Sequence, residues 1–68
     1  MKKITLPDLA YEIMEKDKAD LLIITYRGIT ILSGTPSEIY WSACAVLFAK
    51  AIKYSNRTYT IDIEIDEE

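Results

Sequence analysis

The chain has 68 residues, of which half are hydrophobic, and a formal net charge of −3 with one cysteine and no histidine. A chain of this length forms a single domain, here expected over residues 1–68, whose one core is only marginally stabilising. One cysteine excludes an internal disulfide, and the lack of histidine excludes a zinc site built from four Cys and His ligands.

The positions of the charged and apolar residues also restrict the expected location and partners. Pro7 and Asp8 interrupt any signal-type apolar run near the start of the chain. The longest apolar run, Ala43 to Ala49, is far shorter than the ~20 residues of a membrane span. We therefore expect a cytoplasmic protein without membrane contact. Because Lys and Arg form no cluster, direct nucleic-acid binding is not expected either.

The first predicted element is a helix that begins after Thr5. Thr5 and Asp8 have the spacing of a capping box, and Pro7 falls in the first turn, where its missing N–H costs nothing. Apolar residues then recur at helical spacing, and the pattern ends near Asp17 or Lys18.

Two strands joined by a tight turn follow this helix. The segment Leu21 to Tyr26 is apolar at both odd and even positions, which is typical of a central strand. Arg27 and Gly28 form the predicted turn, and Ile29 to Ser33 is the returning strand. A bulge at the turn is an alternative that would shift the strand register.

A long helix is predicted over residues 37–54. Its start is marked by Thr35 and Glu38, a second capping box, with Pro36 at the first helical position. On a helix, the apolar residues of this segment would cover a sector of roughly 200°, whereas a surface helix needs only about 100°. The surplus suggests that the helix, or the sheet beneath it, meets another chain. A homodimer through one of these surfaces is therefore expected.

The last predicted element is a strand from Thr58 to Asp66, in which apolar and polar residues alternate. The expected fold is α+β in the order α-β-β-α-β, with a three-stranded, mostly antiparallel sheet of order 2-1-3 and two helices on one face. In this arrangement the last strand is an edge, parallel to the second strand and antiparallel to the first.

Three carboxylates of the last strand, Asp62, Glu64 and Asp66, point to one face at a spacing of roughly 6.6 Å. They permit three interpretations: a solvated strand face with a solubilising acidic tail, a mimic of a phosphate backbone, or a hard-cation site. In the first interpretation the charges would also protect the sheet edge that the last strand is expected to form. An extended strand does not form the curved cage that a cation needs, so no metal site is expected.

Apolar residues complete the candidate partner-binding surface. Ile23 and Leu32 are expected on the open face of the sheet, where an apolar patch is a candidate contact site. Trp41, on the long helix, is of a type favoured at interface hot spots. The predicted partner-binding residues are Asp62, Glu64, Asp66, Ile23, Leu32 and Trp41.

The chain shows no arrangement of residues typical of catalysis. It lacks histidine and a Gly-rich phosphate loop, its serines have no evident base, and Cys44 is interpreted as a core side chain. Neither an enzyme nor a cofactor is therefore expected.

The preferred interpretation is a small acidic protein-binding module that acts by occupying a partner's surface. In size and charge it resembles accessory proteins of phages and mobile elements, which often inhibit nucleic-acid enzymes by blocking a basic groove. Two alternatives remain: a structural homo-oligomer without a catalytic role, and a small-ligand-binding domain with a pocket between the long helix and the sheet.

Overall fold

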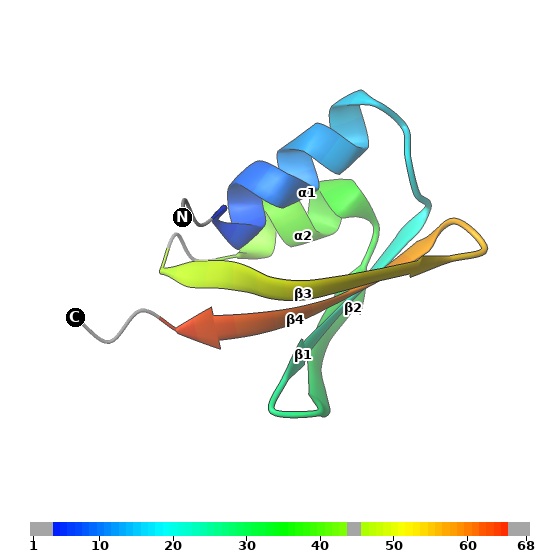
Figure 1. Cartoon of the computed structure of the whole chain (residues 1–68). Helices are drawn as coiled ribbons and strands as arrows, with labels where there is room; N and C mark the ends of the chain where they lie inside the picture. The colour runs from blue at the N-terminus through cyan, green and yellow to red at the C-terminus, as the bar shows by residue number, and fades with distance from the viewer. Residues whose placement is uncertain (1–3, 44–45, 66–68) are drawn as a thin grey trace.

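Two helices cover one face of a four-stranded mixed sheet in the computed structural model, which describes residues 4–43 and 46–65 (Figure 1). The strand order is β2-β1-β4-β3. The predicted α+β class is confirmed. The elements are, in chain order, α1 (Leu6–Glu15), β1 (Leu21–Tyr26), β2 (Ile29–Gly34), α2 (Pro36–Ser42), β3 (Leu47–Ser55) and β4 (Thr58–Ile65).

The sheet corrects the predicted topology in its details. β1 lies between β2 and the last strand, as expected, but it pairs with β4 in parallel and with β2 antiparallel. β3 then pairs antiparallel with β4 on its other side, so β4 is an interior strand rather than an edge. The cause is the additional strand, because β3 reverses the chain once more before β4 begins.

The predicted long helix is wrong beyond its first two turns. Its start is confirmed: Glu38 N donates to Thr35 Oγ1 at 3.2 Å, and Thr35 N donates to Glu38 Oε1 at 2.9 Å. The helix ends at Ser42, and Ala43 has an extended backbone with ψ 144°. Residues 47–55 form a strand instead, so the wide apolar helix sector does not exist. Cys44 lies outside the described residues.

Each of the two β-hairpins is closed by a tight turn whose residues have a left-handed backbone conformation. Arg27 and Gly28 have φ values of 54° and 82°, and Asn56 and Arg57 have φ values of 52° and 57°. Two-residue turns with positive φ at both positions match the right-handed twist of the flanking strands. The predicted turn at 27–28 is confirmed, whereas Asn56, which follows the predicted long helix, belongs to the turn between β3 and β4.

The hydrophobic core lies between the helices and the two interior strands. Leu22 and Ile24 of β1 and Ile61 and Ile63 of β4 are buried, as is Ile39 of α2. The helices therefore cover the face of β4 that carries Ile61 and Ile63. The edge strands supply only partly buried side chains to this core. The other members of this core cluster are Leu6, Leu9, Ala10, Ile13 and Ala19.

A bulge in β2 changes the predicted position of Leu32. Thr25 pairs with Thr30, but Ile24 pairs with Leu32, so the register shifts by one residue between these two pairs. Leu32 therefore shares the covered side of the sheet with Ile24 and packs partly against the core. Its predicted place on the open face is wrong, because the extra residue in β2 reverses the side to which Leu32 points.

Candidate protein-binding site

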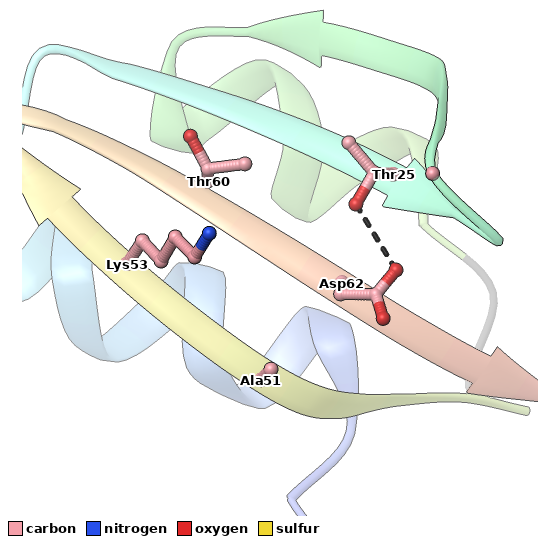
Figure 2. A pocket seen from close by; sticks show the side chains of 6 residues that line it. Thr25, Ala51, Lys53, Thr60 and Asp62 are labelled. Carbon is pink, nitrogen blue, oxygen red and sulfur yellow. Dashed lines mark hydrogen bonds between the residues drawn. The ribbon is translucent and has the colours of Figure 1, made fainter.

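The face of the sheet opposite the helices carries a hollow of about 330 Å³ (Figure 2). Thr25 and Asp62 are cross-strand neighbours, and Thr25 Oγ1 donates to Asp62 Oδ1 at 3.1 Å. Thr60 and Lys53 line the same hollow. The hollow therefore offers hydroxyl groups, one carboxylate and one ammonium group, rather than a purely acidic surface.

Two of the three predicted carboxylates lie in the middle of this open face. Asp62 and Glu64 are half-buried on the interior strand β4, while Asp66 lies outside the described residues. The expectation that these charges also protect a sheet edge is wrong, because β4 is paired on both sides. Lys50 lines a second hollow together with both carboxylates, and Lys53 lines the first with Asp62. Lys50 and Lys53 of β3 therefore line the same hollows as the carboxylates of β4.

The two edges of the sheet differ sharply. The β3 edge carries Lys50 and Lys53, contains a register shift, and is partly covered at its start, where Ala49 N donates to the Ile4 carbonyl at 2.9 Å. Lysines, bulges and covering segments are the usual protection of an edge strand. The β2 edge has the bulge but no charged residue, and Ile29 and Ile31 are 67% and 51% exposed. Among the described residues, no strand pairs with its outer side.

A groove of about 480 Å³ lies beside this edge, between β2 and α2. Trp41 on its border is 79% exposed. The Trp41 ring lies edge-on to Tyr40, with 5.2 Å between centroids, and Tyr40 in turn lies 5.6 Å from Tyr11 of α1. The exposed indole is therefore supported by a row of rings across both helices. The groove is lined by Leu32, Ser33, Ser37, Glu38, Ile39, Trp41 and Ser42.

The predicted site residues thus fall into two groups. Leu32 and Trp41 lie in the groove beside β2, whereas Asp62 lies with Ile23 on the open face. Sequence reasoning missed the exposed edge residues Ile29 and Ile31. The available signal was the absence of any charged residue between Ile29 and Gly34, in a strand that the predicted sheet order already placed at an edge.

A cluster of charged residues at the other end of the sheet has a structural role. Arg57 donates from Nε to Asp20 Oδ2 and from Nη2 to Asp17 Oδ1, each at 3.0 Å. The hydrogen bond from Arg57 lowers the pKa of Asp20, and the two carboxylates raise the pKa of Arg57 above its usual range. The cluster ties the β3–β4 turn to the loop before β1, and its groups are already paired with one another.

Within residues 4–43 and 46–65, no three His, Cys, Asp or Glu side chains gather as metal ligands. None of the helices in this part of the chain is long and apolar enough to cross a membrane. Comparisons with protein families, curated proteins and solved structures find no match to this chain.

Proposed function

We propose that this chain is a small, acidic, cytoplasmic protein-binding module without catalytic activity, which binds an extended protein segment along the free edge of β2. The observation that carries the proposal is the uncharged, exposed edge of β2, in a sheet whose other edge bears lysines and a covering segment. An edge strand presents unpaired backbone N–H and C=O groups that another strand can use, which is a common mode of peptide recognition.

The groove beside β2 would supply specificity to such binding. Successive side chains of an added strand point to opposite faces of the sheet, so every second one would lie on the helix side, next to Trp41 and Leu32. An exposed tryptophan at the border of a groove often contributes much of the binding energy, since burying its ring removes a large apolar area from water.

Selection of peptides from a random displayed library tests this function directly. We expect the wild-type chain to enrich peptides that alternate apolar and polar residues, and Ile31→Lys to abolish the enrichment by placing a charge on the β2 edge. The matched control is Ile52→Lys, because Ile52 is 46% exposed on the other edge strand and Ile31 is 51% exposed. Enrichment that is absent, or equally strong with both variants, would contradict the proposal.

A second candidate function uses the open face. Asp62 and Glu64 lie on one face of β4, and Asp62 borders the hollow with Thr25. These carboxylates would meet the Lys and Arg side chains of a nucleic-acid enzyme, so that the chain blocks a basic surface of that enzyme. Such charge contacts speed association more than they add affinity.

The inhibitor function is tested on a panel of nucleases, polymerases and helicases. We expect at least one enzyme to be inhibited, and the double variant Asp62→Asn/Glu64→Gln to associate about tenfold more slowly with a flatter salt dependence. The control is Asp8→Asn/Glu15→Gln on α1, which removes the same charge from exposed positions. Equal association rates for the two double variants would exclude the acidic open face as the contact surface.

A further inference from the structure

We infer that the strand that occupies the β2 edge is the β2 strand of a second copy of this chain, paired antiparallel about a two-fold axis. The inference rests on the proposed role of this edge and names its partner. It places the dimer interface on a surface different from the two that the sequence suggests, the long helix and the open face.

Self-pairing through β2 would leave the combined sheet with protected edges. Pairing β2 with β2 joins two four-stranded sheets into one continuous sheet, whose outer edges are both β3. Each of these outer edges carries Lys50 and Lys53 and is partly covered by residues 4–5. The dimer therefore pairs the β2 edge, which carries no charged residue, and leaves only the β3 edges exposed. Because the contact is isologous, it closes at two copies.

The charges near β2 suit a copy of the same strand. All six residues from Ile29 to Gly34 are uncharged, so the pairing sets no like charges opposite each other. A pairing centred on Ile31 sets Ile29 of one protomer opposite Ser33 of the other. It thereby brings the turn that carries Arg27 near the start of the partner's α2, which carries Glu38. The symmetry repeats this approach of opposite charges at the other end of the interface. Arg27 and Glu38 are both exposed in the single chain.

The placement of α2 also favours self-pairing through β2. α2 packs over β2 and β1, while α1 reaches toward β3 (Figure 1). A two-fold axis perpendicular to the sheet keeps the helices of both protomers on one face and turns the two α2 helices toward each other. Trp41 and the groove beside β2 then face their symmetry mates. Burial of Trp41, Ile29 and Ile31 adds apolar area to a chain too small for a large core.

Sedimentation equilibrium on the full chain, from about 1 µM to about 500 µM, tests the inference. We expect the mass to rise from the 7.8 kDa of one chain to twice that value and then to remain constant. Ile31→Lys and, as a second variant, Ile29→Lys should each raise the dimer dissociation constant at least about tenfold. The control Ile52→Lys should dimerise like the wild type. Circular dichroism confirms that each variant is folded.

The other outcomes separate this inference from the proposed function. A monomer at every concentration that still selects peptides through the β2 edge would overturn the self-pairing and leave the proposed function standing. A dimer that both β2 variants leave intact would overturn the self-pairing, and a loss of that dimer in the open-face variant Ile23→Lys would place the contact there. A mass that grows without limit would overturn closure at two copies.

Discussion

Arg57 occupies a left-handed backbone conformation, with φ 57°, in the turn between β3 and β4. Residues other than glycine seldom adopt positive φ, so the conformation needs compensation from its surroundings. Here the Arg57 carbonyl accepts a hydrogen bond from Asp20 N at 2.8 Å, and its guanidinium pairs with Asp17 and Asp20. One residue thus fixes both the turn and the loop before β1, which places the strands β1 and β4 side by side.

The Arg57 cluster should make stability depend on pH. The hydrogen bond from Arg57, followed by its charge, lowers the pKa of Asp20 in the folded chain. A carboxyl group with a lowered folded pKa stabilises the fold above its unfolded pKa and loses this contribution as the pH falls through the folded value. We therefore expect the wild type to lose stability below about pH 4 and Asp20→Asn to lose less over the same window.

Urea unfolding at neutral pH and at about pH 3 measures this difference. Asp20→Asn should be less stable than the wild type at neutral pH, and the gap should narrow in acid. Glu15→Gln is the control, because it removes an exposed carboxylate that is not a partner of Arg57. The same pH dependence in all three proteins would show that the Asp20 pair does not stabilise the fold.

Gly28 should be sensitive to substitution through its backbone alone. Its φ is 82°, and a Cβ atom added there would meet no atom within 4 Å. Gly28→Ala is therefore expected to cost about 1 kcal/mol of unfolding free energy, the usual penalty for a left-handed L-residue. Asn56 also has a positive φ, 52°, which glycine adopts without a steric penalty, so Asn56→Gly should leave the unfolding free energy unchanged or raise it. Equal urea midpoints for Gly28→Ala and the wild type would contradict this account of the turn.

At the level of the elements, the sequence predicted those features that depend on a few neighbouring residues. The caps at Thr5 and Thr35, the turn at Arg27 and Gly28, and the alternation from Thr58 onward all locate elements that the structure contains. The prediction of a helix over residues 43–54 failed because the alanines and the apolar spacing of this segment favour a helix locally. The strand conformation of residues 47–55 comes from pairing with β4 through the turn at Asn56 and Arg57, a tertiary contact that overrides propensity.

The candidate site was predictable only in part, for a related reason. The chemistry of Trp41, Ile23 and Asp62 could be read from residue type and strand alternation. The position of Leu32 depends on the register shift at Ile31, which no local motif marks. The contrast between the β2 and β3 edges depends on knowing that residues 47–55 form a strand, and this followed only from the fold.

The start of α2 allows a quantitative test at the level of one element. Thr35→Ala removes the acceptor of the Glu38 N–H and should cost about 1 kcal/mol of unfolding free energy. Ile39→Ala should cost more, about 2–5 kcal/mol, because Ile39 is only 1% exposed. Leu47 is half-buried, so Leu47→Ala should cost less than Ile39→Ala. Urea midpoints measure all three losses.

The neighbouring exposed Ser37 provides the control for this series. Ser37→Ala should leave the urea midpoint nearly unchanged, because Ser37 lies on the exposed side of the first turn of α2. A loss in Thr35→Ala no larger than in Ser37→Ala would mean that the capping box contributes little to the helix.

At the level of the whole molecule, the stability of the fold and the availability of its surfaces are linked. The fully buried side chains come from α1, β1, α2 and β4. The edge strands β2 and β3 are therefore held mainly by backbone hydrogen bonds to one neighbouring strand each. Elements with few buried side chains open more readily than the core. A second strand along β2 would both complete its hydrogen bonding and add the apolar contacts that this edge lacks.

Amide hydrogen exchange resolved by residue tests the β2 edge most directly. Exchange is compared between the dilute chain and the chain with a bound strand, either a selected peptide or a second copy at high concentration. The account predicts that outward amides between Ile29 and Gly34 slow at least about tenfold, while those of residues 50–55 on the β3 edge keep their rates. Unchanged exchange across β2 in the bound state would contradict the account.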